Sequence, residues 1–206
     1  MKKSFPLSKV YGLLEPGPVV LVTTAHKGRA NIMTLSWLTM MDFEPPRIGM
    51  VLSDRNYSFT ALKATNQCVI NIPTVELGKK VVGVGNSSGR RVEKFSAFGL
   101  TPRPAKLVAP PLIDECYANL ECRVTDARMA NRYNFFVLEV LKAWIDPARK
   151  HPRTLHHLGK GRFVVGRKTD GKRVRRKLKL LGERLTALRA HGGAAGSDRK
   201  SDRLVV

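Results

Sequence analysis

Residues 31–58, NIMTLSWLTMMDFEPPRIGMVLSDRNYS, hold the pattern that decides the fold. They predict a small, polar strand over 31–39, a break at Pro45-Pro46, an apolar strand over 48–52 and a polar turn over 53–58. A buried strand rarely contains so many hydroxyls and amides unless they face a polar group, because unpaired buried polar groups are costly. The turn adds a cation, an amide and hydroxyls just before a predicted helix. We therefore interpret this stretch as half of a pocket for a flat, phosphorylated cofactor.

The composition is that of one globular domain with an appendage. The 206 residues are 43% hydrophobic, which suits a domain with a real core. No run approaches the roughly 18 apolar residues of a membrane span. Pro, Lys, Glu and Gly interrupt the N-terminal stretch, so we expect a cytoplasmic protein without a membrane partner. Cys68, Cys116 and Cys122 lie in apolar runs without CxxC spacing, which predicts buried free thiols.

Charge divides the chain into two parts. The net charge is +21, and residues 167–206 carry 13 Lys and Arg against 4 Asp and Glu. We therefore separate a domain, 1–166, from a basic tail, 167–206, in which 172–190 has the spacing of an amphipathic helix. Such a tail attracts phosphates and acidic partners, but it has no aromatic residue for base stacking. We favour a solvated helix, with contact to nucleic acid or an acidic partner as the alternative.

Strand signals dominate the first 145 residues. Residues 116–125 alternate apolar and polar side chains, the period of a half-buried strand. Short strands joined by hairpins, with a few small helices, predict a mainly β protein and a closed antiparallel barrel, because closure removes exposed edges. The predicted strands are 19–24, 31–39, 48–52, 68–72, 116–125 and 134–144, the predicted helices are 59–64, 76–82 and 91–97, and 83–89 is a predicted loop.

Residues 19–161 resemble the flavin reductase-like, FMN-binding split-barrel family, particularly its flavoredoxin-like branch. The resemblance rests on the order and spacing of four segments: GRANIMTLSWLTMMDFEPPRIGMVL, DRNYSFTALKATNQCVINIP, GVGNSSGRRVEK and the run His156-His157-Leu158-Gly159. It implies a six-stranded antiparallel split barrel with Greek-key connections. It also implies a homodimer that binds FMN near the subunit interface.

The resemblance assigns site residues position by position. Asn31, Met33, Thr34, Ser36 and Trp37 are similar to the wall beside the isoalloxazine ring. The phosphate side is Arg55, Asn56, Tyr57 and Ser58, and the closing loop is Asn86, Ser87, Ser88 and Gly89. Chemically, Arg55 offers a forked, charge-assisted contact to phosphate, and a helix beginning near Ser58 offers free N–H groups. The loop departs from the family pattern, because it lacks the cysteine or glycine pair that often precedes Ser-Gly.

These assignments imply an oxidoreductase that takes electrons from NADH or NADPH and passes them through bound FMN to a flavin, iron or protein acceptor. We expect no catalytic side chain, because the cofactor carries the chemistry. The alternative is a non-catalytic flavin-binding or storage module. A dinucleotide fingerprint at 83–88 is disfavoured, because 103–111 lacks the acid that should follow. The histidine cluster His151, His156 and His157 suggests a structural or dimer-contact role, or a place beside the flavin for His157.

Overall fold

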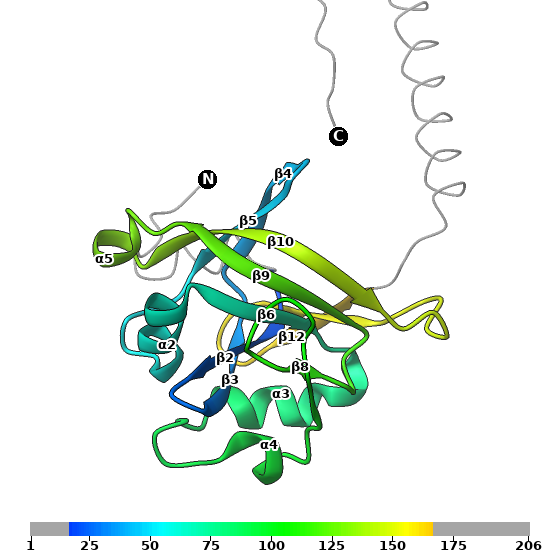
Figure 1. The fold of residues 1–206 in the computed structure, drawn as a ribbon. Coiled ribbons are helices and arrows are strands. Elements are labelled where there is room, and N and C mark those ends of the chain that lie inside the picture. Colours follow the sequence, from blue (N-terminus) through cyan, green and yellow to red (C-terminus); the bar gives the residue numbers. More distant parts are fainter. Residues whose placement is uncertain (1–16, 167–206) are drawn as a thin grey trace, which may run out of the picture. The chain divides into compact units, whose positions relative to one another are not determined.

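The structure is a computed structural model, and it describes residues 17–166 of the chain. The predicted basic helix over 172–190 and the rest of the tail lie outside the described residues, so their role stays a prediction. Figure 1 shows a curled β-sheet with short helices around it. No helix in the described part of the chain is long and apolar enough to span a membrane.

A seven-stranded antiparallel sheet forms the barrel, in the strand order β3-β2-β6-β9-β10-β5-β4. The strands are β2 (Val20–His26), β3 (Arg29–Leu35), β4 (Leu38–Phe43), β5 (Pro46–Val51), β6 (Gln67–Ile72), β9 (Ala118–Asp126) and β10 (Phe135–Ile145). The two edge strands, β3 and β4, are separated in the chain by only Ser36 and Trp37. Three Cα–Cα steps span at most about 11 Å, so the sheet curls until the end of β3 lies close to the start of β4. Among the described strands β3 and β4 do not pair, which leaves the barrel split between them.

A smaller three-stranded sheet lies at the split in the barrel. It contains β1 (Gly17–Pro18), β11 (Thr154–His157) and β12 (Phe163–Gly166), in the order β1-β11-β12. Val19 alone connects β1 to β2, and its N–H donates to the Leu155 carbonyl at 2.9 Å. The β11–β12 hairpin is therefore held beside the start of the first barrel strand.

Short helices and one small hairpin complete the described part. They are α2 (Tyr57–Thr65), the 3-10 turn η2 (Val75–Leu77), α3 (Gly78–Gly85), α4 (Lys94–Ala97), α5 (Ala130–Tyr133), and the paired strands β7 (Pro102–Arg103) and β8 (Leu112–Ile113). In Figure 1, α3 and α4 lie below β2 and β3, α2 lies at one side, and β4 and β5 project as an arm.

Two hydrophobic cores hold these layers together, and β3 contributes to both. Met33 faces the barrel interior, where it joins Met50, Phe136 and other aliphatic side chains. Ile32, its neighbour, faces the other way and packs with Val81 and the rest of the helical layer. This alternation follows from the two-residue period of a strand, and it gives β3 a barrel side and a helix side.

The structure confirms the predicted mainly β, antiparallel class and corrects several elements. The single strand predicted over 31–39 is wrong, since the chain turns at Ser36-Trp37 from one edge of the barrel to the other. The barrel therefore has seven strands rather than six. The apolar strand predicted over 48–52 begins two residues early, at Pro46, and pairs with β4. The sequence reasoning also missed β11 and β12.

The helical predictions are partly confirmed. α2 matches the helix predicted over 59–64, but the loop predicted over 83–89 begins only after Gly85, where α3 ends. The helix predicted over 91–97 is reduced to the single turn α4, because Glu93 accepts hydrogen bonds from the Phe95 and Ser96 N–H groups and caps it there. All three cysteines are buried and free, as predicted.

Candidate functional site

One end of β3 meets α2 and the loop after α3. The Asn31 carboxamide donates a hydrogen bond of 2.8 Å to Ser58 Oγ, and both side chains are buried. Gly89 lies against the same pair of elements, since a Cβ at Gly89 would overlap the Asn31 carboxamide and the Tyr57 ring. The fold therefore brings together four predicted site residues, Asn31, Tyr57, Ser58 and Gly89.

The N-terminus of α2 in this cluster has no anionic partner of its own. Asn56 is the N-cap but makes no side-chain cap hydrogen bond, and the first turn contains no acidic residue. A helix N-terminus carries free N–H groups and a partial positive charge. The end of α2 is thus suited to an anion such as phosphate.

Two arginines that the sequence reasoning missed surround Tyr57. The guanidinium carbons of Arg29 and Arg90 lie 5.4 and 5.6 Å from the centre of the Tyr57 ring. Arg29 also donates to the Gly89 carbonyl at 2.6 Å, which ties β3 to the loop. Arg29 opens β3, two residues before Asn31, and Arg90 directly follows Gly89, so their closeness in sequence to predicted site residues was the available signal. The predicted Arg55 is exposed, and its backbone N–H donates to Ser53 Oγ at 3.3 Å.

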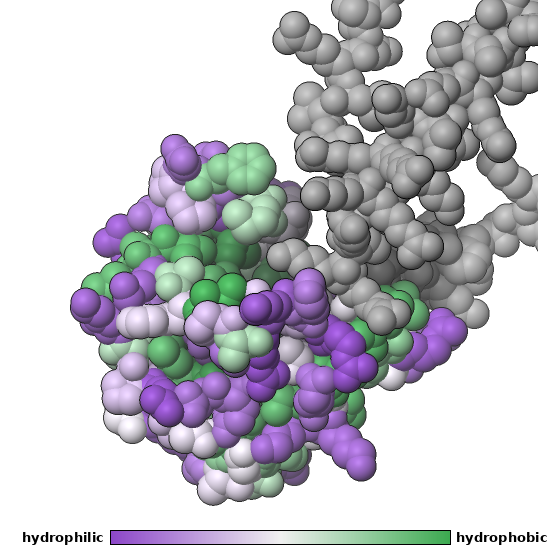
Figure 2. All heavy atoms as spheres, turned by 90° about the vertical axis from the view of Figure 1, so that its right-hand side faces the viewer, coloured by the Kyte–Doolittle hydropathy of each residue, from purple (hydrophilic) through white to green (hydrophobic). Residues whose placement is uncertain are grey.

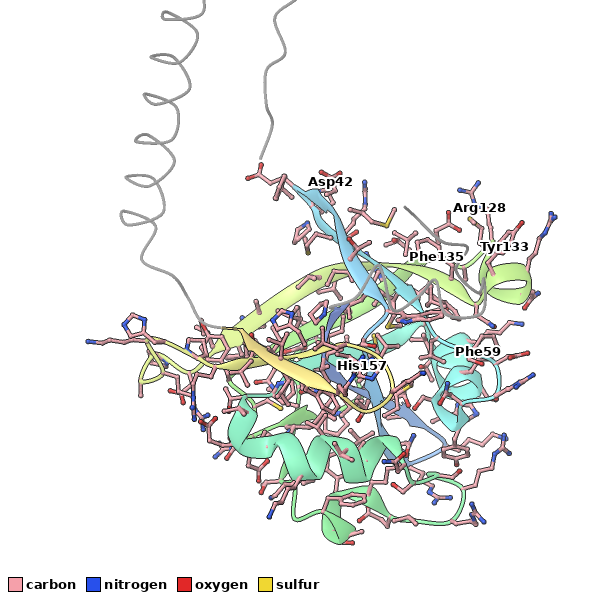
Figure 3. The ribbon with its side chains drawn as sticks, turned by 180° about the vertical axis from the view of Figure 1, so that it is seen from behind. Asp42, Phe59, Arg128, Tyr133, Phe135 and His157 are labelled. Atoms are coloured by element: carbon pink, nitrogen blue, oxygen red, sulfur yellow. The ribbon has the colours of Figure 1, made fainter. Side chains whose placement is uncertain are left out.

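The other end of β3 borders a cavity of about 290 Å³, which we call the β3 cavity. Its polar lining comes from Thr34, Ser36, Asn86 and His157. The His157 ring lies 5.4 Å from the ring of Phe163, which also lines the cavity, so the β11–β12 hairpin forms one wall. Figure 3 labels His157 on this hairpin, beside the barrel strands. The aliphatic and glycine lining is Val19, Leu35, Val81, Val82, Gly85 and Gly161.

Hydrogen bonds fix β3 against α3 along this wall. Thr34 Oγ1 donates to the Val81 carbonyl at 2.7 Å. Lys94, which is buried and was also missed, donates from Nζ to the carbonyls of Ile32 and Val84, both at 2.9 Å. Burial lowers the pKa of the Lys94 ammonium to about 8. Because a neutral amine still has two N–H donors, Lys94 can hold both carbonyls in either protonation state.

The predicted residues thus divide between two ends of one surface. Asn31 to Ser36 is five residues along β3, about 16 Å at 3.3 Å per residue, and the loop after α3 runs beside it. Ser87 and Ser88 lie in that loop, where Ser87 Oγ donates to the Val84 carbonyl and Ser88 Oγ accepts from the Arg90 N–H. Two predicted residues lie apart: Met33 is packed in the barrel core, and Trp37 is 54% exposed.

Alternative readings of nearby motifs are not supported by the geometry. Gly83 and Gly85 lie at the C-terminal end of α3, whereas a dinucleotide fingerprint opens a helix after a strand. Within residues 17–166, no group of three or more His, Cys, Asp or Glu side chains could hold a metal ion. His156 bonds with Thr154 Oγ1 at 3.2 Å, while His151 is exposed in the loop before β11.

Comparison with known proteins identifies the family. The model described as flavin reductase like domain matches residues 13–164, so the chain belongs to that family. The uncharacterized protein YddH of Escherichia coli (strain K12) is 34% identical over 177 residues, which cover 79% of this chain and 91% of YddH. The resemblance seen in the four sequence segments is thereby confirmed.

Two solved structures share the fold. An FMN-binding domain of a flavin reductases-like enzyme from Shewanella baltica is 27% identical, with a TM-score of 0.68, over 81% of this chain and 95% of that one. Flavoredoxin from Methanosarcina acetivorans is 25% identical, with a TM-score of 0.68, over 81% of this chain and 91% of that one. The matched family and the two solved structures therefore point to the same mainly β, antiparallel architecture that this chain has.

Proposed function

We propose that this chain binds FMN along β3 and passes electrons from NADH or NADPH through it to a flavin, iron or protein acceptor. The observation that carries the proposal is the pairing of two features on one strand. The uncapped N-terminus of α2, with Arg29 and Arg90 beside it, lies at one end of β3. The β3 cavity lies at the other end.

The phosphate end offers an anion both positive charge and hydrogen-bond donors. Arg29 and Arg90 approach the same ring, and the first turn of α2 adds backbone N–H groups. Thr24, directly opposite Asn31 on β2, carries the single buried side-chain N or O atom in the described residues that has no hydrogen-bond partner. Thr24 Oγ1 is itself closed to solvent, so the donors that the proposal assigns to a phosphate at this corner are the two arginines and the N–H groups at the start of α2.

The ring end fits a flat heterocycle with polar edges. The β3 cavity combines aliphatic walls with the Ser36 hydroxyl, the Asn86 carboxamide and the His157 imidazole. Aliphatic walls suit the dimethylbenzene edge, and hydroxyl and amide groups suit the pyrimidine edge. FMN would supply hydride acceptance and electron transfer there. The role of the chain is to bind, orient and shield the ring, and Lys94 and Thr34 position the wall for that purpose.

A homodimer is part of the proposal, and the β4–β5 arm supports it. The arm exposes Met40, Met41 and Phe43, with Phe43 at 86% exposure, and Trp37 lies exposed at its base. Figure 3 shows Asp42 at the projecting tip. Exposed apolar clusters of this kind mark interaction surfaces.

Burial of all three free thiols accords with the expected cytoplasmic location.

The first test is the absorption spectrum of the purified full chain, followed by anaerobic titration with NADH and with NADPH. We expect a yellow protein whose flavin bleaches with at least one nicotinamide. Bound flavin that neither nicotinamide reduces would instead favour the storage module. A colourless protein that does not bind added FMN would refute both.

The second test addresses the phosphate end. The double variant Arg29→Ala with Arg90→Ala should weaken FMN by about tenfold or more and riboflavin much less, because riboflavin lacks the phosphate. The matched control is Arg128→Ala, an exposed arginine paired with Asp126 beside α5. Equal losses for FMN and riboflavin would contradict this assignment.

A further inference from the structure

A second cavity, of about 230 Å³, opens at the mouth of the barrel. We call it the mouth cavity. Aliphatic side chains of the barrel interior form most of its wall, among them Ile48, Ile70 and Ile72, and Leu38 and Met40 at the base of the arm close one side. Figure 2 shows hydrophobic surface gathered below the projecting upper part of this face.

The polar lining of the mouth cavity is sparse. Thr39, Thr154 and His156 are its polar side chains, and His156 Nε2 lies 3.2 Å from Thr154 Oγ1. Among residues 17–166, no Lys, Arg, Asp or Glu lines it. A charged ligand would lose its hydration there without a counter-charge, which costs several kcal/mol or more. The lining therefore favours an uncharged, largely apolar molecule with an oxygen that accepts a hydrogen bond.

The volume sets the size of that molecule. An apolar cavity of about 150 Å³ in another protein stays dry and binds benzene. The mouth cavity, at about 230 Å³, is large enough for one substituted ring or two fused rings. A flavin nucleotide or a nicotinamide dinucleotide is too large for it.

The mouth cavity and the β3 cavity are neighbours across the split in the barrel. Val19 lines both of them. Ser36, in the link between β3 and β4, lines the β3 cavity, and Leu38, directly after the link, lines the mouth cavity. His157 lines the β3 cavity, and His156, its neighbour on β11, lines the mouth cavity. A ring in the mouth cavity would therefore lie close to a flavin held along β3.

We propose that the mouth cavity binds a small, uncharged quinone-type compound as an electron acceptor, an inference that rests on the proposed function. Reduction of a quinone there would take two electrons from the reduced flavin, across the strand residues that separate the two cavities, and two protons from solvent by way of His156, while the flavin would release its own proton to solvent. The two carbonyl groups become hydroxyl groups, the flavin is oxidised, and a hydroquinone leaves. The reduced nicotinamide of the proposed function restores the reduced flavin.

The first arm of the test measures binding without turnover. Calorimetric titration of the oxidised full chain with duroquinone, a tetramethyl benzoquinone, should show saturable binding. Thr39→Trp should weaken it at least about tenfold, because Thr39 is exposed at the rim and an indole there fills the cavity without disturbing the barrel core. Leu120→Phe, a second filling variant from the wall, should act in the same direction. Thr125→Trp, on the exposed part of β9, is the matched control and should leave binding unchanged.

The second arm separates the two proposals. With NADH or NADPH present, Leu120→Phe, which lies outside the arm and the β3 cavity, should reduce the rate with duroquinone and leave flavin bleaching and ferric citrate reduction unchanged. Equal duroquinone binding in Thr39→Trp, Leu120→Phe and the parent chain would overturn the mouth-cavity assignment while the proposed function stands. Binding lost in both filling variants, in a protein whose flavin neither nicotinamide reduces, would support the cavity as a ligand site and overturn the proposed function and the acceptor role with it.

Discussion

Asn31 and Ser58 are joined by a buried hydrogen bond of 2.8 Å, from the Asn31 carboxamide to Ser58 Oγ. The bond links the start of β3 to the first turn of α2, two elements separated by the whole β4–β5 arm in sequence. It lies beside the uncapped N-terminus of α2 and under Gly89. The contact therefore sets the geometry of the proposed phosphate end.

Asn31→Leu should destabilise the fold and weaken FMN binding together. The variant leaves the buried Ser58 hydroxyl without its donor, which costs about 1–3 kcal/mol. Urea denaturation and FMN titration measure the two effects. Asn131→Leu, at an exposed asparagine on α5, should stay within about 0.5 kcal/mol of the parent. Unchanged FMN affinity in Asn31→Leu would show that this hydrogen bond does not contribute to FMN binding.

Gly89→Ala should weaken FMN binding, because the added methyl group overlaps the Asn31 carboxamide and the Tyr57 ring. The loop must then move away from β3 and from the end of α2. Fluorescence titration with FMN measures the loss, which we expect to be about tenfold. At Gly78 a Cβ meets only Leu155 Cδ1 at 3.9 Å, so Gly78→Ala should bind FMN normally. If the two variants bind FMN with equal affinity, close packing of the Gly89 loop against Asn31 and Tyr57 is not needed for FMN binding.

Lys94→Met should change how stability depends on pH. The folded chain lowers the pKa of Lys94 from 10.5 to about 8, so between these values the unfolded chain binds a proton that the folded chain has released. The Lys94 contribution to stability then rises with pH across that window. Burial raises the pKa of the Cys116 thiol, which contributes a fall above pH 9 in the parent and the variant alike. Relative to the parent, Lys94→Met should therefore lose the rise that Lys94 contributes. Urea denaturation from pH 7.5 to 10.5 measures it. Lys80→Met, which removes an exposed hydrogen bond to the Gly99 carbonyl, is the control and should keep the rise. The same slope in Lys94→Met and the parent would contradict the prediction.

Phe43→Asp should convert the proposed homodimer to a monomer. The side chain is 86% exposed at the tip of the arm, and a carboxylate there would be desolvated in an apolar interface. Sedimentation equilibrium measures the assembly state. Tyr133→Asp, at an exposed aromatic residue on α5 away from the arm (Figure 3), should leave it unchanged. A Phe43→Asp protein that remains dimeric would place the interface elsewhere.

Much of the fold was predictable because it depends on local patterns. The alternation over 116–125 and the Pro45-Pro46 break both mark strands or hairpins by side-chain period and turn chemistry. The turn at Ser36-Trp37 was missed, because neither residue is a strong breaker. The chain turns there because the barrel closes at that point, which is a property of the whole sheet.

The candidate site was predictable in composition and only partly in arrangement. Asn31, Tyr57, Ser58 and Gly89 do meet in space, and Thr34, Ser36 and Asn86 do line one cavity. Arg29, Arg90 and Lys94 were missed, because each looks like an ordinary surface cation in the sequence. Only the folded chain shows that two of them approach Tyr57 and that the third is buried between two carbonyl groups.

The sequence by itself determined most of the barrel strands, the family and the residue types available for a flavin, because periodicity and motif order are local properties of a chain. The tertiary structure alone decided which of those residues meet. Strand alternation sends Met33 into the barrel core and Thr34 toward α3, and barrel closure brings β3 to β4 across two residues. Proximity between distant segments depends on how the whole sheet packs, and no local pattern encodes it.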